Sequence, residues 1–227
     1  MIPTLDVLFD AAGGEPVAEY GGDPRWTGVA ANFVESLDGV VALPDAGGES
    51  GGVVSGGSRA DRFVMGLLRA CADAVLIGAG TLRAAPGDLW FADSIFPEAR
   101  AIYERIGKLK PRLYVVSGSG AVDRQHPALR EGVLITGKLA PAQIVERVRA
   151  DGHARILCEG GPGLFGELMS AGLIDDLFLT LSPRMFGRWT GDARKSLVEG
   201  RRLDGKPMKI SSMRRSGDHL FLRYQAR

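Results

Sequence analysis

A glycine-rich turn beside one carboxylate is the most chemically suggestive part of this sequence. Residues 155–166 read Arg-Ile-Leu-Cys-Glu-Gly-Gly-Pro-Gly-Leu-Phe-Gly, so an apolar run typical of a buried strand breaks abruptly into glycine. Glycine has no Cβ and lets a ligand lie against the backbone, and Pro162 fits the first turn of a following helix. The free N–H groups of that turn and the positive end of the helix dipole favour a phosphate. We therefore predict an anion-binding loop, with Glu159 at the carboxyl end of the strand beside it.

Two further strand patterns also end in small residues. The apolar run 74–77 is followed by Gly-Ala-Gly-Thr, and the run 113–116 is followed by Ser-Gly-Ser-Gly. Ligands of open α/β sheets bind at the carboxyl ends of the strands, so these junctions are candidate parts of one site. Each also has an ordinary structural interpretation, because Thr81 can cap a helix and a serine-rich turn needs no ligand.

The elements that must position these loops alternate along the chain. We expect strands at 26–37, 74–77, 113–116, 132–136, 155–158 and 177–181, and helices at 58–71, 97–106, 141–150 and 164–171. This alternation predicts an α/β fold with a mostly parallel sheet and helices on both faces. The tail 208–224 alternates around Gly217-Asp218 and predicts a C-terminal antiparallel hairpin.

The N-terminal segment and one glycine-rich stretch carry no such periodicity. Residues 1–26 contain three prolines and two glycine pairs, so we expect an irregular arm, with 27–227 as a single domain. Residues 44–52 predict a loop by composition.

Composition excludes several classes of function. With 28 Lys+Arg against 27 Asp+Glu, the net charge of +1 supplies no field that would recruit nucleic acid or an anionic membrane. No apolar stretch reaches the roughly 20 residues of a membrane span, and the first residues show no export signal. Cys71 and Cys158 fall in separate apolar runs, which suits free thiols in a cytoplasmic protein. The three histidines have no zinc-ligand spacing, so we expect no metal site.

Several motifs, in order, resemble the reductase (C-terminal) domain of the bifunctional deaminase-reductases of riboflavin biosynthesis. They are Asn32-Phe-Val-Glu-Ser-Leu-Asp-Gly39, Leu68-Arg-Ala70 with 72–81, Glu159-Gly-Gly-Pro162, Gly172-Leu-Ile-Asp-Asp-Leu177 and Ser182-Pro-Arg-Met-Phe-Gly187. The resemblance covers about residues 28–190 and implies the dihydrofolate-reductase-like fold. It also implies hydride transfer from NADPH to a pyrimidine-type heterocycle, as in 5-amino-6-(5-phosphoribosylamino)uracil reductase.

The resemblance further implies roles for individual residues. Cofactor contacts would come from Val34, Gly80, Thr81, Ser117, Gly118, Ser119, Gly160, Gly161, Pro162, Gly163, Leu164 and Phe165. Substrate contacts would come from Ser55, Asp61, Arg69 and Glu159. Three acids, Glu159, Asp61 and Asp38, are candidates for the catalytic proton donor, and the sequence does not choose among them.

Departures from the family's pattern leave the substrate open. The acid and the arginine expected after the Gly-Thr motif are missing, since that register reads Ala85, Pro86, Gly87 and Leu89-Trp90. A charge-assisted phosphate contact contributes about 1.5–3 kcal/mol, so a phosphoribosyl substrate would need Arg59, Arg69 or Arg83 as a replacement.

A different substrate would use another residue. Asp61 begins a helix and resembles the acid with which dihydrofolate reductases bind the pterin ring, although an acid at a helix start is also common for its dipole alone. A dihydrofolate or pterin reductase is therefore the first alternative, and a non-catalytic nucleotide-binding module is the second.

The resemblance also implies assembly. We expect a homodimer, with the apolar strand 177–181 and the hairpin around Gly217-Asp218 offering a pairing surface.

Overall fold

The computed structural model of the chain describes residues 1–43 and 50–227. Within these residues the strands form one sheet in the order β1-β8-β9-β7-β2-β6-β3-β4-β5. Their bounds are β1 Asp6–Asp10, β2 Val29–Ser36, β3 Ala74–Gly78, β4 Arg112–Ser117, β5 Val133–Thr136, β6 Ile156–Cys158, β7 Asp176–Ser182, β8 Met208–Ser216 and β9 His219–Ala226. Strands β2 to β7 run parallel, whereas β9, β8 and β1 add antiparallel pairs at one side.

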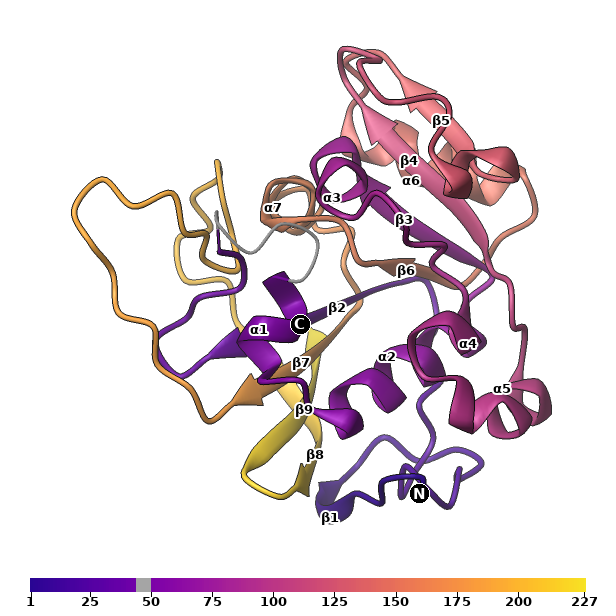
Figure 1. Cartoon of the computed structure of the whole chain (residues 1–227), viewed down its shortest axis with the longest axis vertical. Helices are drawn as coiled ribbons and strands as arrows, with labels where there is room; N and C mark the ends of the chain where they lie inside the picture. Colours follow the sequence, from indigo (N-terminus) through magenta and orange to yellow (C-terminus); the bar gives the residue numbers. More distant parts are fainter. Residues whose placement is uncertain (44–49) are drawn as a thin grey trace.

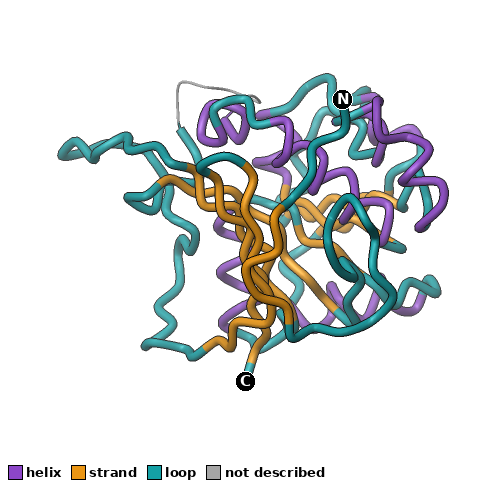
Figure 2. Tube along the Cα trace, turned by 90° about the horizontal axis from the view of Figure 1, so that it is seen from below, coloured by secondary structure: helices purple, strands orange, loops and turns teal. Residues whose placement is uncertain are grey.

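Helices cover both faces of this sheet (Figures 1 and 2). They are α1 Ser50–Ser55, α2 Arg59–Cys71, α3 Ala79–Ala84, α4 Ala92–Ile95, α5 Arg100–Ile106, α6 Pro141–Ala150 and α7 Pro162–Ser170, with 3-10 turns η2 Pro97–Ala99 and η3 Pro127–Arg130. The predicted mixed, mostly parallel sheet with a C-terminal hairpin is confirmed. None of the helices among these residues is both long and apolar enough to cross a bilayer.

Alternation along the parallel strands divides the core into two layers. Ala30 packs in one cluster with Phe63 and Leu67 of α2, while its neighbour Ala31 packs in the other with Phe165 of α7. A strand with apolar residues on both faces is what a sheet covered on both sides requires. Because β2 to β7 run parallel, the carboxyl ends of these strands lie at one edge of the sheet. The loops after β3, β4 and β6 that were singled out above follow the strands at this edge.

Helix α2 forms as its sequence predicts. The Ser58 hydroxyl accepts the backbone N–H of Asp61 at 3.3 Å, so it satisfies one of the free donors of the first turn. The helix ends at Cys71, and both Asp61 in its first turn and Arg69 in its last turn are buried. Two ionisable side chains are thereby held inside the molecule.

The N-terminal arm is not irregular throughout, which corrects the expectation for residues 1–26. Asp6–Asp10 forms β1 on the outer side of β8, and Leu5, Tyr20 and Trp26 are buried in the core. The sequence did not predict β1, because all five of its residues are exposed and show no alternation of polar and apolar side chains. What fixes it is the buried Arg214, which reaches the carboxylate of Asp10 and the carbonyl of Tyr20.

Two smaller expectations also change. Strand β7 lies between β2 and β9, so it has no free edge through which two subunits could pair. The loop expected at 44–52 lies partly outside the described residues, and from Ser50 onward the chain forms α1 instead.

Arg214 allows a direct test of how the arm is held. Its guanidinium is 1% exposed and lies 4.0 Å from the centre of the Tyr20 ring, so Arg214→Met should lower the free energy of unfolding by about 2–4 kcal/mol. Arg215→Met removes an exposed pair with Asp6 and should cost no more than about 1 kcal/mol. Urea denaturation measures both, and equal losses would contradict this account of the arm.

Candidate active site

The glycine loop between β6 and α7 is packed tightly on one side and open on the other. A Cβ on Gly160 would lie 2.8 Å from the backbone nitrogen of Gly78, so this glycine lets two strand ends approach each other. A Cβ on Gly161 would lie 3.3 Å from Oγ1 of Thr81. A Cβ on Gly163 would meet none of the described residues within 4 Å. The open side of the loop is therefore at Gly163, in the first turn of α7.

Hydrogen bonds leave that first turn with unused donors. The N–H of Gly161 donates to the Thr81 hydroxyl at 2.8 Å, and the N–H of Phe165 donates to the carbonyl of Gly161. Pro162 has no N–H, which leaves the N–H groups of Gly163 and Leu164 without a protein acceptor in the described part of the chain. With the helix dipole behind them, these groups suit an anion.

Thr81 bridges two loops and does not cap its own helix. The N-cap position of α3 is Gly78, with no side-chain cap, whereas the Thr81 hydroxyl accepts from Gly161 across the gap to α7. Gly80, beside it, has open space around its Cα up to the side chain of Arg83 at 4.0 Å. The loops after β3 and β6 are thus tied into one surface.

In the serine loop after β4, only some of the groups predicted to bind the cofactor are exposed. Ser117 is 4% exposed, whereas Gly118 and Ser119 are exposed. The Ser119 hydroxyl accepts the N–H of Ala121 at 3.3 Å, which folds the loop back at Gly120 with φ at +73°. Of the two serines, Ser119 is the one whose hydroxyl a ligand can reach.

Glu159 and Arg69 form a buried ion pair. The Nε and Nη2 atoms of Arg69 donate to the Glu159 carboxylate at 3.0 and 2.8 Å, and both side chains are 7% exposed. The Nη1 atom of Arg69 donates to the carbonyl of Phe91. The Glu159 carboxylate is therefore occupied by a two-pronged, charge-assisted bond to a guanidinium, which fixes its position in the site. The two residues predicted to contact substrate bind each other.

Asp38 is used in a turn. Its carboxylate accepts hydrogen bonds from the Ser36 hydroxyl at 2.6 Å and from the backbone N–H groups of Phe186 and Gly187, in the loop after β7. The hydrogen bond from Ser36 and those from the backbone lower the pKa of Asp38. An exposed carboxylate held as an anion makes a weak proton donor, so the structure favours a bracing role.

Asp61 is the candidate acid whose environment favours the protonated form. Burial raises the pKa of Asp61 to about 6, and the charge of Glu159 adds to the increase. A hydrogen bond with the Thr180 side chain and the charges of His219 and Arg62 oppose it. A carboxyl group that changes protonation near neutrality is suited to proton exchange.

Sequence reasoning missed the neighbours of Asp61. Thr180 is 2% exposed and stands in the middle of the apolar strand β7, and a polar residue in a buried strand was the available signal. His219 starts β9, and its Nε2 lies 2.9 Å from the carbonyl of Ser55. Ser55 itself is buried, and its hydroxyl donates to the carbonyl of Gly52 at 3.2 Å.

The predicted residues Val34 and Phe165 contribute mainly packing. Val34 is 8% exposed on β2, and the Phe165 ring packs 5.0 Å from that of Phe33 inside the core. The side chains at both positions are therefore used in packing.

The three arginines considered for a substrate phosphate each contact another group of the protein. Arg59 pairs with Glu98 and lies over the Phe96 ring, and Arg69 pairs with Glu159. Arg83 reaches the carbonyl of Ala121 in the loop after β4.

A cation to which the sequence assigned no role is Arg184, two residues after the end of β7. Its guanidinium fills the space beside Gly56, where a Cβ would lie 2.3 Å from Nε. Arg184 therefore faces the turn that leads into α2.

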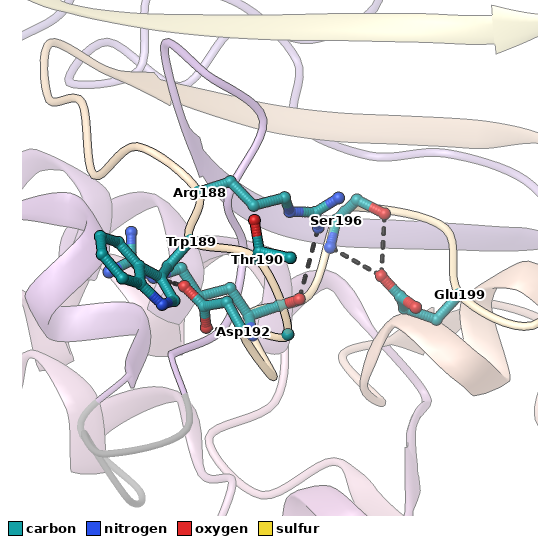
Figure 3. Close-up of a pocket in the computed structure, with 8 residues that line it drawn as sticks. Arg188, Trp189, Thr190, Asp192, Ser196 and Glu199 are labelled. Carbon is teal, nitrogen blue, oxygen red and sulfur yellow. Dashed lines mark hydrogen bonds and ion pairs between the residues drawn. The ribbon is translucent and has the colours of Figure 1, made fainter.

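A hollow of about 750 Å³ lies apart from these residues, inside the connection from β7 to β8 (Figure 3). Its lining consists of Arg188, Trp189, Thr190, Gly191, Asp192, Arg194, Ser196 and Glu199. The charged groups largely satisfy one another, since Arg194 pairs with Asp192 and Glu199 accepts from Ser196. None of the predicted site residues lines it, and its contact with the glycine loop is a backbone bond from Glu199 to Pro162.

A family model and many solved structures match this chain. The model described as the RibD C-terminal domain matches residues 27–222. No curated protein sequence matches. RibD from Acinetobacter baumannii superposes with a TM-score of 0.67 at 16% identity, over 88% of this chain and 58% of that one.

Two further structures extend the comparison. A diaminohydroxyphosphoribosylaminopyrimidine deaminase/5-amino-6-(5-phosphoribosylamino)uracil reductase from Thermotoga maritima gives a TM-score of 0.68 at 17% identity, over 88% of this chain and 56% of that one. A dihydrofolate reductase from Enterococcus faecalis complexed with NADP(H) gives 0.52 at 12% identity, over 87% and 95%. The chain spans a little over half the length of the first two proteins, and identities this low show a shared fold.

The protonation of Asp61 predicts a pH dependence of stability. Because the pKa rises from 3.8 to about 6 on folding, the stability that this group contributes is complete below about pH 4 and is lost as the pH rises through 6. In the unmodified protein the free energy of unfolding should fall by up to about 3 kcal/mol between pH 4 and 7 through this group. The variant Asp61→Asn should not show this fall.

A second carboxylate supplies the control for this titration. Asp38→Asn should act with the opposite sign, because the pKa of Asp38 is lowered and its contribution is lost on acidification. Urea denaturation at a series of pH values compares the variants with the unmodified protein. Identical pH profiles for Asp61→Asn and the unmodified protein would refute this description of Asp61.

Proposed function

The chain belongs to the RibD C-terminal domain family, and on that premise we propose that it is an NADPH-dependent reductase of a pyrimidine-type heterocycle. The substrate that the family suggests is 5-amino-6-(5-phosphoribosylamino)uracil or a close relative. The observation that carries the proposal is the anion-suited first turn of α7, which lies at the same sheet edge as the buried acid Asp61.

The residues present fit the proposed cofactor. The open side of the loop at Gly163 gives room for a pyrophosphate against unused N–H groups, and Thr81 holds that loop in place from α3. The exposed loop at Gly118 and Ser119 extends the same edge towards the adenosine end. When bound, NADPH supplies a hydride to a C=N or C=O carbon of the substrate.

The chain's own part in the reaction is orientation and proton supply. The Arg69–Glu159 pair fixes the start of the glycine loop relative to α2, so the distance between cofactor and substrate sites is set by a rigid contact. Asp61, with a pKa of about 6, is the group that can hold a proton near neutral pH and release it directly or through water.

A second candidate function is the reduction of a dihydrofolate or pterin. The observation in its favour is that Asp61 is buried at the start of α2 beside Thr180, where a carboxylate can accept hydrogen bonds from the amino and N–H groups of a pterin edge. The fold shared with a dihydrofolate reductase agrees with this alternative.

Location and assembly belong to the same proposal. We expect a cytoplasmic enzyme that acts on a small molecule and binds neither nucleic acid nor membrane. We also propose a homodimer. Since β7 is an inner strand, its contact must use another surface, and the outer strand β1, with exposed Val7, Leu8 and Phe9, offers an apolar one.

Gly163 separates cofactor binding from folding. Gly163→Asp places a negative charge at the start of α7, which should raise the free energy of unfolding by roughly 0.5–1.5 kcal/mol through the dipole and reduced backbone freedom. The same charge should repel a pyrophosphate and weaken NADPH binding at least about tenfold. Calorimetric titration and thermal unfolding measure the two effects, and Gly163→Ala controls for added volume. Unchanged NADPH affinity in Gly163→Asp would rule out this loop as the pyrophosphate site.

A substrate screen tests the function itself. NADPH oxidation is followed with the phosphoribosylaminouracil, with dihydrofolate and with a dihydropterin. Asp61→Asn should reduce kcat/KM about ten- to a thousandfold with whichever substrate the unmodified protein turns over, because the variant lacks the proposed proton donor. We expect turnover of the aminouracil. Robust pterin reduction that collapses in Asp61→Asn would favour the second candidate, and cofactor binding without turnover of any substrate would favour a non-catalytic nucleotide-binding module.

A further inference from the structure

We propose that Arg83 recognises the 2′-phosphate of NADPH and thereby selects NADPH over NADH. The inference rests on the proposed cofactor and adds to it a residue for which the family resemblance supplied no cofactor role. It follows from where the structure places this side chain.

Arg83 bridges the two loops that would hold the adenosine end. It lies in the last turn of α3, and its Nη1 donates to the carbonyl of Ala121 at 3.3 Å. Its Nη2 lies 4.0 Å from the position of a Cβ on Gly80. The guanidinium therefore crosses from the loop after β3 to the loop after β4, along the carboxyl edge of both strands.

The surroundings of this guanidinium suit a phosphate. Ala121 also donates its N–H to the Ser119 hydroxyl, so Arg83 and Ser119 hold opposite sides of one residue and lie within reach of the same ligand group. Residues 117–122 contain no carboxylate, whereas a site for the free ribose hydroxyl of NADH would be expected to carry one. Only one donor of the Arg83 fork is used within the described residues, which leaves others for phosphate oxygens.

The same contact separates Arg83 from the substrate. Asp61 and Thr180, which mark the substrate end, lie at α2 and β7, and strands β2, β6 and β3 separate β7 from β4 in the sheet. A side chain anchored on the loop after β4 therefore acts at the far end of the cofactor. Its removal should change cofactor choice and leave substrate binding alone.

The test measures binding of both cofactors by calorimetry with the full chain. Arg83→Ala should weaken NADPH binding about ten- to a hundredfold and change NADH binding less than about twofold. The fragment 2′,5′-ADP should lose affinity in the same proportion as NADPH, while 5′-AMP should not. Arg83→Lys keeps the charge without the fork and should fall between. Arg149→Ala, an exposed arginine on α6 at the opposite face of the sheet, is the control for loss of one positive charge.

The outcomes distinguish this inference from the function on which it rests. If the unmodified protein binds NADPH and Arg83→Ala keeps the same ratio of NADPH to NADH affinity, the role of Arg83 is refuted and the cofactor proposal stands. A parallel loss of both cofactors would also refute it, because that result indicates damage to the shared loops. If the unmodified protein binds neither dinucleotide, the proposed function fails and this inference fails with it.

Discussion

The buried pair between Arg69 and Glu159 is the interaction on which the geometry of the candidate site depends. It joins the last turn of α2 to the residue that begins the glycine loop, and the remaining donor of Arg69 reaches Phe91 in the segment before α4. Removing either partner would leave a charge inside the protein without compensation, at a cost of several kcal/mol, so the two arms of the site are locked to each other. A helix on one face of the sheet and a loop at its edge therefore form one rigid unit.

This pairing also distributes the chemical roles. The Glu159 carboxylate is occupied by a guanidinium and that of Asp38 by the turn after β7, whereas burial raises the pKa of Asp61 to about 6, so that its proton can be exchanged near neutral pH. Glu159 still affects it, since its negative charge raises the pKa of Asp61. Glu159, which was predicted to contact the substrate, therefore positions the glycine loop and raises the pKa of Asp61.

The sequence predicted the parts of the structure that local patterns determine. Strong apolar periodicity located α2, with Ser58 as its cap, and the alternation of elements gave the parallel sheet. Strand β1 was missed because its pairing depends on Arg214, more than 200 residues away, and its own residues show no alternation. The sequence also indicated Arg69 and Glu159 as site residues but not that they contact each other. That contact depends on tertiary packing, because the two residues are 90 positions apart. Thr180 and Arg184 belong to the site's surroundings only because β7 lies next to β2.

The positions of the arginines bear on whether the substrate carries a phosphate. An aminouracil and a pterin both offer N–H donors along one ring edge, so a buried carboxylate such as Asp61 is compatible with either and the phosphate end must discriminate. Of the arginines near the candidate site, Arg69 is paired with Glu159 and Arg83 lies on the cofactor side. Two others lie closer to the substrate end: Arg62, whose charge acts on Asp61, and Arg184, beside the turn into α2. A phosphoribosyl substrate would therefore meet its cation on the side of α2 and β7, where Arg62 and Arg184 lie, because residues 84–98, which follow Thr81, contain no lysine or arginine.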